Sequence, residues 1–137
     1  MNRKCVIVLN ENLPAGLAAN SAAILGLTLG HKVPELVGRD TVDGAGRVHL
    51  GIINLTLPIL KSDADSLRTL RDRLYGPEYA ELTVVDFSDT AQHCKDYEDY
   101  VLRAAALPPE SHCYYGLALH GPQKMVNRLT GGLPLLR

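Results

Sequence analysis

Asp86 and Lys124 stand where an α/β protein could use a charged side chain for chemistry. Asp86 is expected to end a strand, and open α/β sheets place their sites at the carboxyl ends of strands. Its carboxylate could serve a substrate, or it could assist Ser88 in capping the helix that follows. Lys124 comes after Gly121 and Pro122, where a strand should pass into a helix with free N–H groups. This lysine could hold an anion at the Gly121 corner, or it could be an ordinary solvated side chain.

Asn20 is a third candidate, in an uncharged stretch from Leu13 to Gly30. That stretch contains Pro14 and three glycines, so it is predicted to be a buried helix rather than a membrane span. Asn20 should lie near the end of the helix that faces the loop after the first strand. Its amide is expected either to brace that loop as a hydrogen-bonded buried group or to contact a ligand.

Several other chemistries lack the residue spacing that they need. The five histidines form no HExxH motif and have no Cys-x-x-Cys neighbour, so we predict no metal site. His112 and Cys113 are adjacent in a predicted strand and would point to opposite faces, which argues against a cysteine nucleophile. The fragment Gly44-Ala-Gly46 lacks the third glycine of a dinucleotide fingerprint, and no P-loop is present, so no cofactor is predicted. Asp43 should instead close a turn there through bonds to nearby backbone.

Length and charge limit what the chain can do. With 137 residues and a formal net charge of −1, it should form one domain over residues 1–137 that buries its own core. The near-neutral balance disfavours a broad basic surface for tRNA or other RNA. Three cysteines without paired spacing are typical of free thiols in a reducing compartment. We therefore expect a cytoplasmic protein with neither a signal peptide nor a membrane segment.

Strand and helix patterns alternate along the chain, which is typical of an α/β layer architecture. The predicted strands are Arg3 to Leu9 (buried on both faces), a segment within Val48 to Leu60, Leu82 to Phe87, and the run ending at Gly121. The first predicted helix follows a turn over residues 10–14 and runs to about Gly30, and the second starts at Ser62, which should cap it, and ends at Gly76. The third runs from Ser88 to Pro108, and the last from Pro122 to a left-handed stop at Gly131. The helix that Ser88 caps should turn Ala91, Cys94, Val101 and Ala105 inward.

The two ends of the chain resemble peptidyl-tRNA hydrolase type II. Near the start, Val6 to Leu9, Leu13 to Gly16 and Ala18 to Asn20 occupy the places of that family's first strand, loop and Ala-Ala-Gln helix. Near the end, Gly116 to Pro122 and Leu129 to Leu136 match its Gly-Ile-Gly-Pro-type strand end and its Val-Thr-Gly-x-Leu-x-Leu-Leu helix end. These motifs cover roughly a third of the chain.

The comparison with the hydrolases also shows departures. Their helix-start lysine falls on Gly16 or Leu17, and their glutamine becomes the shorter Asn20. Asp86 and Thr90 keep the spacing of the hydrolases' Asp-Ala-Gly-x-Thr motif, but a long helix that those enzymes lack is predicted to follow.

Most of the length is more similar to a bacterial domain-of-unknown-function family, number two thousand, which is grouped with the same fold. The matching positions are Asn20, Asp43, Gly46, His49, Gly51, Asp96, Tyr97, Tyr100 and the segment from Gly121 to Gly131. This resemblance implies a fold and no activity.

Together the resemblances imply a three-layer α/β/α domain of the peptidyl-tRNA hydrolase II type, with a small mixed sheet of about four strands and the last one antiparallel. They imply a cleft near residues 10–12, Asn20, Asp86, Thr90 and the Gly121–Lys124 corner. The implied chemistry is ester or amide hydrolysis. Asp86 would act as or orient the base, Thr90 and Asn20 would position the substrate, and Lys124 would hold a phosphate or carboxylate. By the same analogy a homodimer is expected.

Two other functions stay open at this point. One is a non-catalytic module that binds a small anion, a metabolite or a protein partner. The other is RNA binding without hydrolysis, which the charge balance disfavours.

Overall fold

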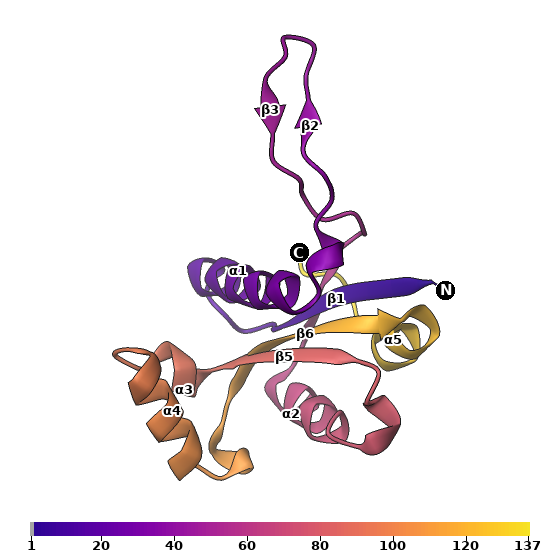
Figure 1. Ribbon diagram of the computed structural model, residues 1–137. Coiled ribbons are helices and arrows are strands. Elements are labelled where there is room, and N and C mark those ends of the chain that lie inside the picture. The colour runs from indigo at the N-terminus through magenta and orange to yellow at the C-terminus, as the bar shows by residue number, and fades with distance from the viewer. Residues whose placement is uncertain (1) are drawn as a thin grey trace.

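Four strands form one mixed sheet at the centre of the computed structural model, which describes residues 2–137 (Figure 1). They are β1 (Arg3–Asn10), β4 (Ile59–Ser62), β5 (Thr83–Ser88) and β6 (Tyr114–Pro122), in the order β4-β1-β6-β5. β1 is parallel to β4, whereas β6 is antiparallel to both of its neighbours, β1 and β5. The predicted mixed sheet of about four strands with an antiparallel last strand is therefore confirmed.

Helices cover both faces of the sheet and make three layers (Figure 1). The continuous apolar run of β1 supplies both sides, because alternate side chains point to opposite faces. Cys5, Ile7 and Leu9 belong to the core under α1 (Ala15–Lys32). Val6 and Val8 belong to the core on the other face, under α2 (Ala64–Arg73) and α5 (Gln123–Thr130).

The helix predicted after Ser88 is two helices, α3 (Asp89–Gln92) and α4 (Tyr97–Ala106). Asp96 breaks the predicted helix, because its carboxylate accepts a 2.8 Å hydrogen bond from the Asp99 N–H and starts a new one. α4 lies beyond the end of β5 and buries none of its residues (Figure 1). Val101, expected to face inward, is 46% exposed.

The apolar stretch from Val48 to Leu60 is also split. Its start belongs to a hairpin of β2 (Thr41–Val42) and β3 (Val48–His49) that projects from the body (Figure 1). Its end is the start of β4, an edge strand of the main sheet, which begins directly after Pro58. The predicted turn is confirmed: Asp43 Oδ1 accepts hydrogen bonds from the N–H groups of Ala45 and Arg47, at 2.8 and 3.1 Å. Gly46 adopts the positive φ of 80° that this turn needs.

Three helix ends or faces differ from the sequence-based expectation. Asp63, not Ser62, caps α2, since Ser62 is still paired in β4. Gly131 ends α5 in a right-handed conformation, with φ of −63°. α1 is not a buried helix, because only Ser21, Leu25 and Leu29 along it are buried.

Three short 3₁₀ turns complete the chain, at Pro34–Leu36, Pro77–Tyr79 and Pro109–Ser111. Among residues 2–137, no helix combines the length and the hydropathy that crossing a bilayer requires.

Candidate functional site

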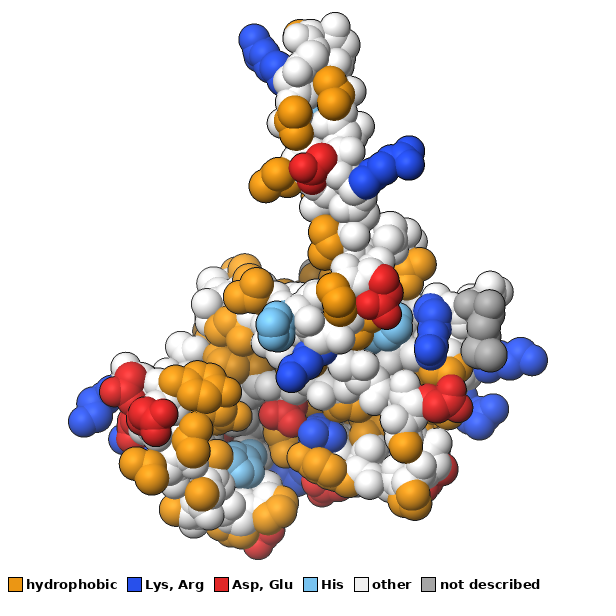
Figure 2. All heavy atoms as spheres, viewed as in Figure 1, with side chains coloured by type: hydrophobic (Ala, Val, Ile, Leu, Met, Phe, Trp, Pro, Cys, Tyr) orange, Lys and Arg blue, Asp and Glu red, His pale blue; other side chains and the backbone are white. Residues whose placement is uncertain are grey.

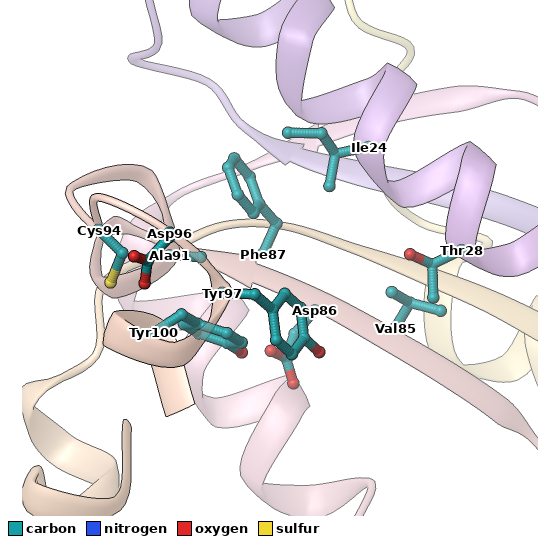
Figure 3. Close-up of a pocket in the computed structure, with 10 residues that line it drawn as sticks. All are labelled: Ile24, Thr28, Val85, Asp86, Phe87, Ala91, Cys94, Asp96, Tyr97 and Tyr100. Carbon is teal, nitrogen blue, oxygen red and sulfur yellow. The ribbon is translucent and has the colours of Figure 1, made fainter. Parts of the chain in front are cut away.

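Two hollows meet at Asp86, on an edge strand of the sheet, and Figure 3 shows the residues that line the first of them. We call them together the Asp86 cleft. The first, of about 420 Å³, is lined by Ile24, Thr28, Val85, Asp86, Phe87, Ala91, Cys94, Asp96, Tyr97 and Tyr100. The second, of about 390 Å³, is lined by Tyr75, Asp86, Ser88, Tyr100, Ala104, Leu107, Pro109, His112 and Tyr114. Asp86 and Tyr100 belong to both hollows.

An ion pair fixes Asp86 in the cleft. Arg71, in the last turn of α2, donates from Nε to Asp86 Oδ2 at 2.7 Å. The Arg71 side chain is only 10% exposed, and its guanidinium lies 3.9 Å from the centre of the Tyr75 ring. Arg71 does not line either hollow, so it holds the carboxylate from behind. The second oxygen, Oδ1, accepts no hydrogen bond from any residue in the described range 2–137.

Four tyrosines surround this carboxylate: Tyr75, Tyr97, Tyr100 and Tyr114. Burial, and then the negative charge of Asp86, raise the pKa of Tyr100, and the same two causes raise the pKa of Tyr114 to about 12. Both phenols therefore keep their protons near neutral pH and can donate hydrogen bonds. The Tyr97 and Tyr100 rings pack edge to face with centroids 5.6 Å apart, which stiffens the rim of the cleft.

His112 is held at the other side of the cleft by two contacts. Its Nδ1 lies 2.9 Å from Thr90 Oγ1, and Arg68 Nη2 donates to its carbonyl oxygen at 3.1 Å. Thr90 itself is 7% exposed and does not line either hollow. Thr90 therefore lies behind His112 and not on the surface of either hollow, whereas the resemblance implied a residue that contacts the substrate.

The lining of the cleft is acidic. It contains the carboxylates of Asp86 and Asp96 but no lysine or arginine. Arg71 compensates the charge of Asp86 from behind, so Asp96 supplies the unpaired negative charge of the lining, and Asp86 Oδ1 can still accept a hydrogen bond from a cation. In residues 2–137, no three His, Cys, Asp or Glu side chains gather in a way that could hold a metal ion.

The structure brings Asp86 and Thr90 to one region but separates the other predicted site residues from them. Gly121 pairs with Lys4 at the start of β1, whereas Asn10 ends that strand about 20 Å away. Because β6 is antiparallel to its neighbours, its carboxyl end lies at their amino ends, so the single predicted cleft is wrong. Lys124 is exposed, and it lies near Gly121 and the start of β1 rather than near Asp86.

Three further details correct the predicted site. A side chain at Gly121 would overlap Leu82, so this glycine lies against the leucine and lines none of the hollows described here. Asn20 is exposed on α1 and does not line the cleft, so it is not a buried amide. Asp86 lies inside β5, two residues before its end at Ser88, rather than at the end of the strand.

Sequence reasoning missed the roles of Arg71, Tyr75 and Tyr114. Arg71 was interpretable only as a cation near a helix end, because nothing local indicates that β5 passes beside α2. The spacing of Tyr97 and Tyr100, three residues apart, was a usable signal, since it places both rings on one helix face.

A family model for a protein of unknown function, DUF2000, matches residues 3–137. The solved structure of a protein of unknown function from Agrobacterium tumefaciens strain C58 is similar, with a TM-score of 0.86 and 20% sequence identity over 98% of each chain. At that identity the likeness shows a shared fold and nothing about activity. The curated proteins offer no match to the chain.

The phenol of Tyr114 should report the charge of Asp86. In the wild type its pKa is about 12, so it should ionise after the exposed tyrosines in an absorbance titration at alkaline pH. Because the unfolded chain would lose this proton near pH 10, folding stability should fall between about pH 10 and 12. Asp86→Asn should lower the pKa of Tyr114, and Asp65→Asn, on the exposed side of α2, should not. An unchanged Tyr114 titration in Asp86→Asn would contradict the proposed proximity of the two groups.

The match to the family model covers nearly the whole chain, and the chain therefore belongs to the DUF2000 family of proteins of unknown function.

Proposed function

We propose that this protein binds a small molecule that carries a protonated amino group, or another compact cation, next to an apolar body. The observation that supports this function is the lining of the Asp86 cleft, which combines two carboxylates and four tyrosines and has no lysine or arginine. Aromatic faces attract cations through their quadrupoles, and a carboxylate adds a charged hydrogen-bond acceptor.

Each of the two hollows would bind a different part of the ligand. The first is bounded on one side by Ile24, Val85 and Phe87, which would receive the apolar body of the ligand. The second offers Ser88, His112 and the Tyr114 phenol as hydrogen-bonding groups. Asp86 lies where the hollows meet, and Arg71 occupies only one of its carboxylate oxygens. A ligand amine at this junction would reach the other oxygen while its body extends to either side.

Calorimetric titration with matched phenylalkyl ligands tests the proposal. A phenylalkylamine should bind and raise the melting temperature, whereas the carboxylic acid and the alcohol with the same carbon skeleton should bind at least about tenfold more weakly. Asp86→Asn, which keeps the shape and the contact with Arg71, should weaken binding of the amine by about tenfold or more. Asp65→Asn on the exposed side of α2 is the matched control and should bind like the wild type. Equal binding of the acid and the amine would contradict the proposal.

A second candidate function is the hydrolysis of an ester or amide, as the resemblance to peptidyl-tRNA hydrolase II implies. The observation that favours it is the 2.9 Å contact between Thr90 Oγ1 and His112 Nδ1, which orients the imidazole in a hollow that also contains Asp86 and Ser88. A histidine held at Nδ1 can exchange a proton through Nε2 with a bound water. An aminoacyl ester would also present the cationic amine that the acidic cleft favours.

Turnover assays separate this second candidate from simple binding. With N-acetyl-aminoacyl-tRNA and with a small aminoacyl ester as substrates, a hydrolase should lose about 10²-fold or more of its rate in His112→Gln. Thr90→Val should retain part of the activity, because it removes only the group that orients His112. Hydrolysis of the uncharged N-acetylated substrate in preference to the free amine would count against the acidic cleft as the binding site. Absence of turnover by the wild type at high enzyme concentration would exclude hydrolysis of these substrates and leave the amine-binding proposal intact.

A further inference from the structure

The projecting hairpin is ordered by its own hydrogen bonds and not by the body of the protein. We call residues 38–52 the arm (Figure 1). All residues from 39 to 50 are exposed. At the base, Gly38 N–H donates to the Ile52 carbonyl at 2.8 Å, and Gly51 N–H donates to Asp40 Oδ1 at 2.9 Å. The backbone at the base is thus paired within the arm, and the apolar side chains of the arm are not covered.

One side of the arm is aliphatic apart from Asp40, which the strand register places opposite Leu50. Val42 and Val48 are cross-strand partners, and the alternation of an extended chain puts Leu50 and Ile52 on the side of Val48. These four side chains, which we call the arm face, are 62%, 63%, 79% and 80% exposed, respectively. Figure 2 shows hydrophobic side chains in the open along the arm. The opposite side carries Thr41 and the bonded pair Asp43 and His49, with 2.8 Å between Oδ2 and Nε2.

The composition of the arm indicates that its exposed side binds another surface. A two-stranded hairpin alone is marginally stable in water, and four neighbouring aliphatic side chains exposed together mark an interaction surface. The arm points away from the body, so its face is not covered by the chain that carries it (Figure 1).

The outer side of α1 is a second apolar surface on the same side of the sheet as the arm (Figure 1). A surface helix ordinarily exposes charged residues, yet α1 has none from Ala15 to Gly30. Its exposed positions include Ala15, Ala19, Ala23 and Leu27, which lie four residues apart and form one stripe. Leu27 is 78% exposed, and the alanines beside it would let another backbone approach closely.

We propose that two copies of this chain form a two-fold dimer in which the arm face of each copy packs on the outer side of α1 of the other. The stripe on α1 carries no charge, and the carboxylate on the side of the arm face, Asp40, already accepts a hydrogen bond from Gly51 N–H at the base of the arm. A two-fold axis makes the contact reciprocal, so that both arms and both helices are covered in one closed assembly. This inference concerns a surface separate from the Asp86 cleft and is independent of the proposed function.

The area of these surfaces suits such a dimer. A fully exposed Val, Leu or Ile side chain presents about 100 Å² of apolar surface, so the arm face offers about 280 Å². Two arms and the helix surfaces that they cover would bury about 1,100 Å² in total, before backbone atoms are counted. Stable specific interfaces start near 1,200 Å². The arm and α1 together therefore approach the size of a stable interface without any other contact.

Sedimentation velocity over a range of protein concentrations tests the proposal. The wild type should sediment as a dimer. Leu50→Asp in the arm face and Leu27→Asp in α1 should each raise the dimer dissociation constant about a hundredfold or more, because each buries a charge in the interface. Two controls match them: Thr41→Asp, on the polar side of the same arm, and Leu102→Asp, at a position of α4 that is 69% exposed. Both controls should remain dimeric, and all four variants should keep the wild-type circular dichroism spectrum because the side chains lie outside the core.

Cross-linking shows which surfaces meet. Leu50→Cys protein labelled with ¹⁵N is mixed with unlabelled Leu27→Cys protein and treated with a short bismaleimide. Mass spectrometry should find residues 50 and 27 joined between a heavy and a light peptide. A monomeric wild type, or a dimer that Leu50→Asp leaves intact, would overturn the proposal. Dissociation by Leu50→Asp but not by Leu27→Asp, without the 27–50 cross-link, would overturn the assignment of α1 as the surface that receives the arm.

Discussion

The ion pair between Arg71 and Asp86 joins the parts of the molecule that make the candidate site. Arg71 belongs to α2 under one face of the sheet, and Asp86 belongs to β5 at its free edge. A guanidinium that is 90% withdrawn from water needs a carboxylate close by, because an unpaired buried charge is strongly destabilising. The same contact leaves one oxygen of Asp86 facing the tyrosines of the cleft. The ion pair thus fixes the edge strand β5 to α2. The charge of Asp86 on this strand also disfavours pairing of the edge with a strand from another molecule.

The central elements could be predicted because each has a strong local signal. β1 is a run of apolar residues buried on both faces, and the predicted strand differs from the observed one by a single residue. β6 and α5 follow from an apolar run, Gly121 and Pro122, which together mark a strand that passes into a helix. The turn closed by Asp43 depends on side-chain bonds to residues two and four positions away, so it too was visible in the sequence.

The site could be predicted only in part, because its geometry depends on strand direction and register. Asp86 and Thr90 are near each other in sequence, and the structure keeps them in one region. Lys124 is separated from them because β6 runs against β5, and nothing near Lys124 carries that information. The Arg71 contact joins residues from two elements with no shared motif. The length of β5 mattered as well, since Asp86 reaches the cleft from within the strand rather than from its end.

The arm and α1 show how one composition can have two explanations. The uncharged stretch from Leu13 to Gly30 predicted a buried helix, yet one side of α1 faces solvent in the single chain. Homodimer interfaces are more apolar than the rest of a protein surface, so the proposed dimer would account for this composition. The apolar stretch from Val48 to Leu60 likewise predicted a strand of the sheet, and in the structure its first residues form part of an exposed hairpin face. In each case the hydrophobic pattern indicates burial without saying which chain supplies the cover.

A double-mutant cycle across the ion pair tests the central claim most directly. Arg71→Met, Asp86→Leu and the double variant would be unfolded in urea alongside the wild type. We expect each single change to cost about 1–3 kcal/mol of unfolding free energy, and the double variant to be more stable than the sum of the two predicts by about 1 kcal/mol or more. Coupling arises because each single variant leaves one charge without its partner. Strictly additive effects would contradict the account, since they would mean that the two residues contribute to the fold independently of each other.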